Sequence, residues 1–239
     1  RIRIPTESPA ATKMVLTAEE GAADENEPVF GQAVLNIHNF TKLIKASNEL
    51  MSDEGANLEA YISSTFARAA AKAENYYLTI GSGSSEPQGV LTGATSSSIT
   101  TAGATAITAA EIVSLRGKLG SAYHVPGEVG WMMQFATKNY IQGITGNPFN
   151  FIRTPAGNAD SMLSYPFYVS DDMEALAATK KAVLIGNFSF YAFAERQGMM
   201  VQRNPYLYMA NGQVGLFASV RFGGVVLQSE AFQYMTQHS

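Results

Sequence analysis

The residues best suited to acid–base chemistry are three closely spaced carboxylates, Asp171, Asp172 and Glu174, directly after the segment "PFYVS". Such a group can exchange protons or bind a divalent metal, and it defines one hypothesis, a monomeric hydrolase. The same spacing is also typical of a helix start, where a carboxylate accepts hydrogen bonds from free backbone N–H groups. We favour the helix start, because nothing else in the sequence points to hydrolysis.

The remaining reactive residue types are few. The three histidines, His38, His124 and His238, lie far apart in the chain without the spacing of metal ligands, so structural roles are expected. The absence of cysteine excludes disulfides, thiolate zinc sites and a cysteine nucleophile. We therefore predict no catalytic residue, no metal and no cofactor.

The glycine-rich stretch "GSGSSEPQGVL", residues 81–91, raises the question of a phosphate-binding loop. A P-loop needs a lysine and a hydroxyl residue after its last glycine, whereas Gly89 is followed by two apolar residues. The stretch also follows a predicted helix, whose C-terminal end carries partial negative charge. Gly81 and Gly83 are instead expected to end that helix in a tight turn, and Pro87 to stop it.

The helix before this loop is the strongest local signal. Apolar residues recur with helical spacing between Gly55 and Leu78, and Ser52 or Asp53 could cap the N-terminus. At about 1.5 Å per residue the helix would be roughly 35 Å long. The small residues of its central "ARAAAKA" would let another element approach closely.

An acidic cluster lies near the N-terminus, in "AEEGAADENEP". One interpretation is a solvated loop. However, strand candidates flank it, namely residues 1–5 and 13–17 before it and "QAVLNIHNFTKLIKAS" after it, which predicts a long two-stranded arm with the acids at its tip. Such a hairpin is marginal alone and needs a surface to lie on. The acids are Glu19, Glu20, Asp24, Glu25 and Glu27.

The rest of the chain mixes helices and strands without a regular βαβ period, which favours the α+β class. Residues 92–111 are predicted as a loose surface connection, with a short hairpin as a further option. Thr108 and Glu111 are predicted as the capping box of a helix that ends near Gly120. We expect a strand and then a helix in residues 128–144, two strands in residues 180–204, and two more in residues 212–227.

Composition supports a globular protein. Of 239 residues, 46% are hydrophobic and 15% charged, and the net charge of -4 gives no basic stripe for reading nucleic acid. No apolar run is long enough to span a membrane. The start "RIRIPTES" has neither an apolar signal core nor a methionine, so we expect it to be a processing boundary.

The order of these parts resembles a known family. Residues 45–91 resemble the central signature of tailed-bacteriophage major capsid proteins of the Hong Kong 97 type, in which a strand ending in S-x-E-L-x-x-D leads into a long spine helix and then a G-x-G-x-x-x-P-x-G loop. Residues 183–232 look like the closing strands of that family. The resemblance implies a non-enzymatic shell protein.

The resemblance also implies a division of the chain. Residues 1–35 would form the N-terminal strand and extended arm, which lies over a neighbouring subunit. Residues 36–91 and 193–222 would form the peripheral domain with spine helix 54–78, and residues 92–192 and 223–239 the axial domain. The segment "NPYLYMANGQ" would form the tip near threefold junctions.

Partners follow from the same resemblance. The protein would assemble with itself as pentamers and hexamers in a virion made in the host cytoplasm, contact packaged double-stranded DNA non-specifically, and meet portal and decoration proteins. A removed N-terminal scaffolding region would fit the start at Arg1. The acidic tip would meet basic residues of the neighbour, for which we name Arg68, Lys72, Arg196 and Arg203. An encapsulin-like compartment, which resembles the same fold, is the alternative.

Some family members cross-link their subunits through a lysine in the arm and an asparagine in the peripheral tip, assisted by a glutamate. Lys13 and Asn211 are the counterparts here, but Ser219 and Val220 occupy the positions expected for the glutamate. The sequence therefore predicts a non-covalent shell.

Overall fold

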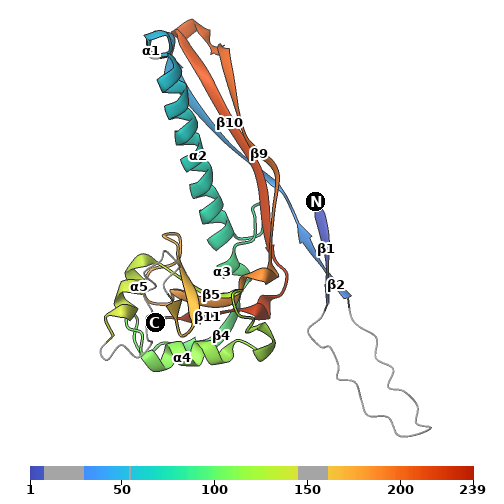
Figure 1. The fold of residues 1–239 in the computed structure, drawn as a ribbon, viewed down its shortest axis with the longest axis vertical. Helices are drawn as coiled ribbons and strands as arrows, with labels where there is room; N and C mark the ends of the chain where they lie inside the picture. The colour runs from blue at the N-terminus through green and yellow to red at the C-terminus, as the bar shows by residue number, and fades with distance from the viewer. Residues whose placement is uncertain (8–29, 54, 145–160) are drawn as a thin grey trace, which may run out of the picture.

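The computed structural model describes residues 1–7, 30–53, 55–144 and 161–239. Figure 1 shows an elongated lobe built around the long helix α2 (Gly55–Ile80), a compact lobe at one end of it, and a two-stranded ribbon at its side. Helices and strands are mixed without a regular βαβ period, so the predicted α+β class is confirmed.

The elongated lobe contains an antiparallel sheet of three strands in the order β3 (His38–Ser47), β10 (Gln213–Val226) and β9 (Tyr191–Tyr208). The prediction of two strands in residues 212–227 is wrong, because β10 is continuous. Gly223 lies within this strand, where the backbone that joins β2 to β3 passes very close. A Cβ on Gly223 would lie 2.0 Å from the Asn36 carbonyl oxygen, so only glycine fits at this position.

A short helix, α1 (Asn48–Asp53), joins β3 to α2. The Ser47 hydroxyl accepts a hydrogen bond from the Leu50 amide (3.2 Å), so Ser47 caps α1. The predicted cap at Ser52 is wrong, since Ser52 lies inside α1 and its hydroxyl donates to the Asn48 carbonyl (2.8 Å). The side chain of Asp53 lies outside the described part of the chain.

Helix α2 packs on one face of this sheet at two places. At the distal end, Phe66 and Ile62 are buried against Leu216 and Ala218 of β10. At the end near the compact lobe, the Tyr77 and Phe40 ring centroids are 4.8 Å apart. The long amphipathic helix is therefore confirmed, with small side chains between its two anchor points.

The compact lobe holds a six-stranded sheet in the order β4-β11-β8-β5-β7-β6. The prediction of a loose connection after the glycine loop is wrong in part, because Thr95–Thr100 forms strand β4, parallel to β11. The other strands are β5 (Val129–Met133), β6 (Ser161–Met162), β7 (Tyr165–Val169), β8 (Val183–Asn187) and β11 (Phe232–Thr236).

Three helices accompany this sheet: α3 (Val90–Gly93), α4 (Ala109–Lys118) and α5 (Phe135–Gln142). The predicted capping box of α4 is confirmed, with reciprocal hydrogen bonds between Thr108 and Glu111. The predicted strand followed by a helix is confirmed by β5 and α5. Trp131 is fully buried in the core of this lobe and donates from Nε1 to the Met162 carbonyl (3.0 Å).

The ribbon pairs β1 (Ile2–Glu7) with β2 (Phe30–Leu35) in antiparallel register. Strands predicted on either side of the acidic cluster are thus confirmed for β1 and β2, while residues 13–17 lie outside the described ranges. Short 3-10 turns complete the fold at Ser121–Tyr123, Phe188–Phe190, Met209–Asn211 and Ser229–Ala231.

Replacing Phe66 by alanine should lower the free energy of unfolding of the unassembled subunit by roughly 3–5 kcal/mol, because it removes a buried ring from the distal anchor of α2. Tyr61→Ala is the matched control, since this aromatic residue lies on the same helix and is 64% exposed. Urea unfolding followed by circular dichroism measures both variants. Equal losses in the two would contradict the packing described.

Candidate assembly surfaces and the lobe junction

The glycine loop forms a small closed turn at the end of α2. The Gly81 amide donates to the Tyr77 carbonyl (3.0 Å), which completes the helix, and the Gly89 amide donates back to the Gly81 carbonyl (2.8 Å). Within the turn the Gly83 amide donates to the Pro87 carbonyl (3.2 Å), and Gly83 has a left-handed backbone with a φ of 78°.

Glycine is required here by close approach. A Cβ on Gly81 would lie 2.3 Å from the Pro87 carbonyl oxygen, and one on Gly89 would lie 2.6 Å from the Gly81 nitrogen. The Glu86 carboxylate accepts a hydrogen bond from the Ser82 amide (2.7 Å), which lowers the pKa of Glu86. A carboxylate of the loop itself thus occupies a backbone donor that a phosphate site would use.

The loop also ties α2 to the strands that run between the two lobes. The Gln88 amide donates to the Gly224 carbonyl (3.0 Å), and the Gln88 side-chain oxygen accepts from the Val226 amide (3.2 Å). The Tyr191 hydroxyl donates to the Gln88 carbonyl (2.7 Å), and burial raises the pKa of Tyr191. These bonds hold the end of α2 against β9 and β10.

A second junction lies one to two turns earlier on α2. The Asn75 side-chain amide donates to the Ser170 hydroxyl (3.0 Å) and to the Asp172 carboxylate, and Thr79 lies beside Ser170 with the hydroxyl oxygens 3.5 Å apart. Thr79 and Ser170 are buried. Asp172 therefore helps to hold the compact lobe against the long helix.

The carboxylates that suggested a hydrolase do not cap a helix, because residues 171–180 form turns and bends. That prediction fails because Asp172 accepts instead from Asn75 of another element. Glu174 pairs with the Lys180 ammonium (3.1 Å) and accepts from the Lys181 amide (2.6 Å). Two of the three carboxylates are thus held by different structural partners.

Two of the three histidines have hydrogen-bonding contacts within the fold. His124 contacts the Tyr165 hydroxyl (2.8 Å) and the Leu119 carbonyl (3.1 Å), and His238 contacts the Ser239 carbonyl (2.7 Å). Across the described ranges, no three histidine, aspartate or glutamate side chains gather as a metal site would require. In the same ranges, none of the helices is long and apolar enough to cross a membrane.

The four basic residues named from the sequence are all exposed but belong to two elements. Arg68 and Lys72 lie on α2, where Arg68 donates to the Thr65 hydroxyl (3.1 Å). Arg196 and Arg203 lie on β9, and Arg203 is 3.8 Å from Glu59. The five acids expected to meet them lie outside the described residues.

The candidate cross-linking residues can be placed only in part. Asn211 is exposed at the distal tip, in the turn between β9 and β10, whereas Lys13 lies outside the described ranges. Ser219 and Val220 are neighbours on β10 whose side chains point to opposite faces: Val220 is buried toward α2, and Ser219 is on the other face.

An acidic pair that sequence reasoning missed lies between α2 and β9. Partial burial, and then the negative charge of Glu195, raise the pKa of Glu74. Glu195 lies opposite the buried Phe222 in the strand register, on the side of the sheet that α2 covers. Because 121 positions separate the two residues, the pair is visible only once α2 is packed on the sheet.

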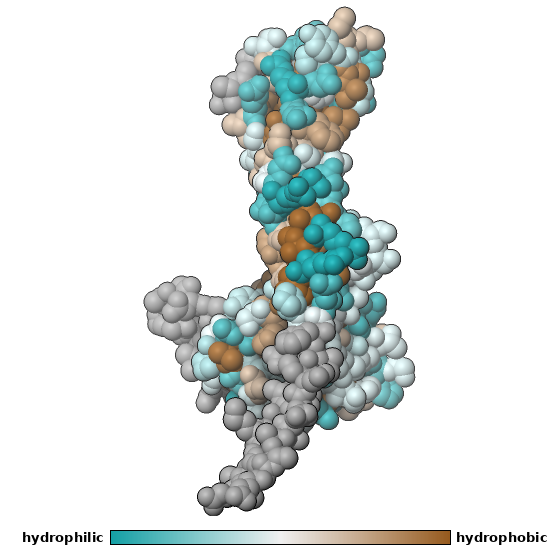
Figure 2. Space-filling view, turned by 90° about the vertical axis from the view of Figure 1, so that its right-hand side faces the viewer, coloured by the Kyte–Doolittle hydropathy of each residue, from teal (hydrophilic) through white to brown (hydrophobic). Residues whose placement is uncertain are grey.

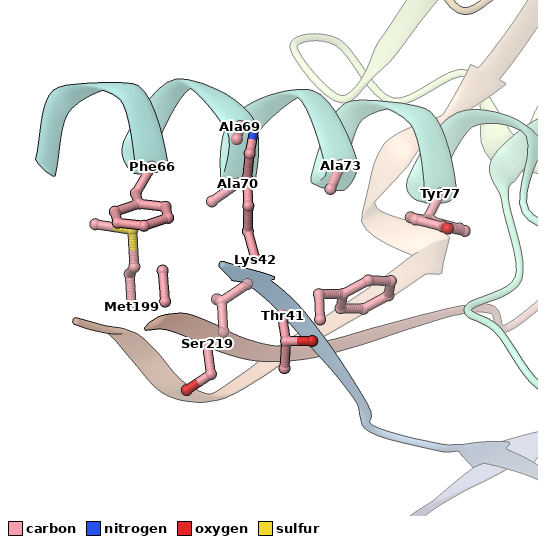
Figure 3. Close-up of a pocket in the computed structure, with 12 residues that line it drawn as sticks. Thr41, Lys42, Phe66, Ala69, Ala70, Ala73, Tyr77, Met199 and Ser219 are labelled. Atoms are coloured by element: carbon pink, nitrogen blue, oxygen red, sulfur yellow. The ribbon is translucent and has the colours of Figure 1, made fainter. Parts of the chain in front are cut away.

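An open groove of about 320 Å³ lies between the two anchor points of α2, as Figure 3 shows. Phe66 and Tyr77 point from the helix toward the sheet at its two ends. The small side chains of Ala69, Ala70 and Ala73 lie between them, with Lys42 of β3 rising beside the helix. This is the thin part of the helix that the sequence predicted.

Strand β9 is the most exposed element of the elongated lobe. It forms an edge of the sheet, and none of its eighteen residues is buried. Tyr206 is 79% exposed, Met209 just beyond the strand 69%, and Leu207 51%. Apolar side chains in such numbers on an edge mark a surface for association.

Comparison with known proteins agrees with this geometry. A model of the phage capsid family matches residues 1–237. Among curated protein sequences no significant match is found.

Solved structures share the fold. The capsid of a native GTA particle, computed with C5 symmetry, is 23% identical and covers 100% of this chain and 85% of its own, with a TM-score of 0.80. The capsid of an empty GTA particle gives 24% identity, 99% and 85% coverage, and a TM-score of 0.80. A structure from Mycobacterium phage Bobi gives 13% identity, 100% and 85% coverage, and a TM-score of 0.74.

The fold and its exposed strand edge define a protein built for association, with the capsid fold that the resemblance implied. The chain belongs to the phage capsid family: it is a major capsid protein, a component of the virion whose copies form its shell. Family and fold thus favour a shell subunit over the hydrolase.

Replacing Gly89 by alanine should lower the free energy of unfolding by about 1–3 kcal/mol, because the new Cβ would collide with backbone that cannot move aside. Gly117→Ala in α4 is the matched control, since nothing lies within 4 Å of its added Cβ. Removing this helical glycine should raise stability by about 0.5–1 kcal/mol. Thermal unfolding of both subunits tests this, and a Gly89→Ala variant as stable as the parent chain would refute the close packing of the loop.

Proposed function

We propose that copies of this chain form an icosahedral shell of pentamers and hexamers around double-stranded viral DNA. The observation that carries the proposal is strand β9, an eighteen-residue edge strand without one buried residue, which a neighbouring subunit could cover. The C5 symmetry of the two GTA capsids supports fivefold association of similar subunits. In this proposal the protein is structural and catalyses no reaction.

The proposed division of labour follows the two lobes. Residues 36–91 and 193–222 serve as the peripheral domain, residues 92–192 and 223–239 as the axial domain at the centre of each ring, and residues 1–35 as the arm. The short connection between the ribbon and the sheet supports the role of residues 1–35 as an arm attached to the peripheral domain, because β2 and β3 are separated only by residues 36 and 37. Force on the arm would therefore be transmitted directly to the three-stranded sheet.

Exchange of arms between subunits would hold the shell together. Each contact is small, but it is repeated around a closed ring, where every subunit both gives and receives an arm. We propose that the acids at positions 19–27 meet basic residues of the neighbour's elongated lobe, among which Arg68, Lys72, Arg196 and Arg203 are exposed.

The contents and further partners of the shell are proposals of the same kind. With a net charge of -4, the subunit is suited to non-specific rather than base-reading contact with packaged DNA. Portal and decoration proteins would join the assembled shell, and the subunit would be made in the host cytoplasm.

Neutralising the acidic cluster, with Glu19, Glu20, Glu25 and Glu27 changed to glutamine and Asp24 to asparagine, should reduce the yield of shells while leaving subunit unfolding unchanged. The reason is that these charges would act between copies and not within one. Sedimentation measures the yield and circular dichroism the folding. Asp171→Asn with Glu230→Gln removes two exposed acids of the compact lobe, and it is compared with Glu19→Gln and Glu20→Gln alone, which changes the net charge equally. Undiminished shell yield in the arm variant would rule out this role of the acids.

Assembled shells should dissociate to single chains under denaturing electrophoresis, because Ser219 and Val220 provide no carboxylate to assist a bond between Lys13 and Asn211. A ladder of covalent oligomers would show that the shell is cross-linked. Loss of that ladder in Lys13→Arg would then assign the bond to this lysine.

A further inference from the structure

We infer that Asn211 is a self-modifying site, at which the side-chain amide is lost without an enzyme and a carboxylate is left at the distal tip. The site lies in the turn Met209–Asn211 between β9 and β10, beside α1 at the end of the elongated lobe (Figure 1). Asn211 is the only asparagine of the sequence that is followed by glycine. The modification belongs to the single chain and does not depend on the proposed shell.

The Asn-Gly pair places an electrophile beside a nucleophile. The Gly212 nitrogen can bond to the Asn211 Cγ atom, which closes a cyclic imide as the amide C–N bond breaks and ammonia leaves with the proton of Gly212. Water then opens the imide at either carbonyl group, and the product is aspartate or isoaspartate. The net change is hydrolysis of an amide to a carboxylate and ammonium. Glycine favours ring closure because it has no side chain to obstruct the attack.

The turn itself requires glycine at this position. Gly212 has a left-handed backbone with a φ of 62°, which ends the 3-10 turn, and nothing lies within 4 Å of a Cβ added there. Other residues adopt this conformation only at a cost. An unobstructed backbone nitrogen after Asn211 is therefore a consequence of how β9 turns into β10.

Asn211 is also free to react. Its side chain is exposed, and across the described ranges it has no hydrogen-bond partner. Asn204 on β9 provides the contrast, because its side-chain oxygen accepts from the Tyr206 amide (3.0 Å) and the Leu207 amide (3.2 Å). Asn204 also precedes Pro205, whose nitrogen carries no hydrogen to release. The two asparagines should therefore differ in reactivity.

One contact of the tip opposes the reaction. The Gly212 amide donates to the Met209 carbonyl (3.2 Å), and this bond must open before the nitrogen can attack. A turn bond at an exposed tip opens locally, without unfolding of the lobe. Because a single hydrogen bond contributes little net free energy, it should slow the reaction by no more than about tenfold.

The new carboxylate would weaken association through the tip. It would lie close to the exposed apolar side chains of Tyr206, Leu207 and Met209. Figure 2 shows hydrophobic beside hydrophilic surface at this end of the lobe. A neighbour that covers these side chains would have to bury the charge as well, which costs free energy. This consequence for assembly rests on the proposed function.

Isoaspartate would disturb the tip in a second way. It lengthens the backbone by a methylene group between Asn211 and Gly212. The Gly212 carbonyl accepts a hydrogen bond from the Asn48 amide at the start of α1 (2.9 Å). The longer backbone would displace this carbonyl, so the bond between the turn and α1 would be lost.

Mass spectrometry of the purified subunit tests the modification. The protein is incubated in mildly alkaline buffer, either folded or unfolded in guanidinium chloride, and digested with trypsin. Trypsin cleaves after arginine and releases residues 204–221 as a single peptide that contains both asparagines. We expect aspartate and isoaspartate to accumulate at Asn211, while Asn204 stays unchanged. The folded rate should lie within about tenfold of the unfolded rate.

Asn211→Gln is the matched variant, because its longer side chain keeps the amide but closes a ring far more slowly. It should show no conversion at this position over the same period. A folded subunit that stays unmodified while the unfolded chain converts would overturn the inference. Equal conversion at Asn204 and Asn211 would overturn it as well.

Shell yield tests the consequence for assembly. Asn211→Asp carries the charge from the start and should give several-fold fewer shells than Asn211→Gln at equal subunit concentration, as measured by sedimentation. Circular dichroism checks that both variants fold. Equal yields would overturn the effect on association. Failure of the parent chain to form particles would instead overturn the proposed function, and the mass measurement on single chains separates these failures from that of the modification.

Discussion

The structure of this subunit depends on one constraint: a three-stranded sheet has two faces, and a single long helix can cover only one of them. Helix α2 buries the alternate residues of β10 that point toward it, whereas Phe217 on the other face is 37% exposed. Strand β9 adds an exposed edge along its whole length. A fold of this shape leaves apolar surface in water until other copies cover it, which is how a capsid subunit gains stability by assembling.

The second physical requirement is a fixed relation between the two lobes. A shell closes only if every subunit presents its surfaces at consistent angles. Two sets of hydrogen bonds fix α2 relative to the compact lobe: the glycine loop bonded to Gly224, Val226 and Tyr191, and Asn75 bonded to Ser170 and Asp172. Both sets are built from neutral groups and one carboxylate, so they act at short range and in specific directions. The glycines first considered for phosphate binding therefore serve to position one lobe on the other.

The sequence predicted those parts of the fold that depend on local chemistry. The spacing of apolar residues gave helix α2, and the side chains of Thr108 and Glu111 gave the start of α4, because each signal lies within a few residues. The strand β4 was missed, since its residues Thr95–Thr100 are small and mostly polar and its partner β11 lies more than 130 positions further along the chain. Two strands were expected in residues 212–227, whereas in the fold β10 is one strand whose Gly223 and Gly224 allow close approach of the Asn36 backbone and the Tyr191 side chain.

The candidate assembly surfaces were less predictable than the helices, because they depend on pairing between distant segments of the chain. Sequence alone identified charged residues that could meet a neighbour, but which of them share a face depends on the register of β3, β10 and β9. The pair of Glu74 on α2 and Glu195 on β9 could not be predicted from sequence either, because only the packing of the helix on the sheet brings the two residues together.

This protein functions by associating with itself into a closed shell. The most direct measurement is electron microscopy of the purified protein together with its particle mass. We expect uniform closed particles with fivefold vertices and a mass in the megadalton range. A population of 25.6 kDa monomers at concentrations where similar capsid subunits assemble would contradict it.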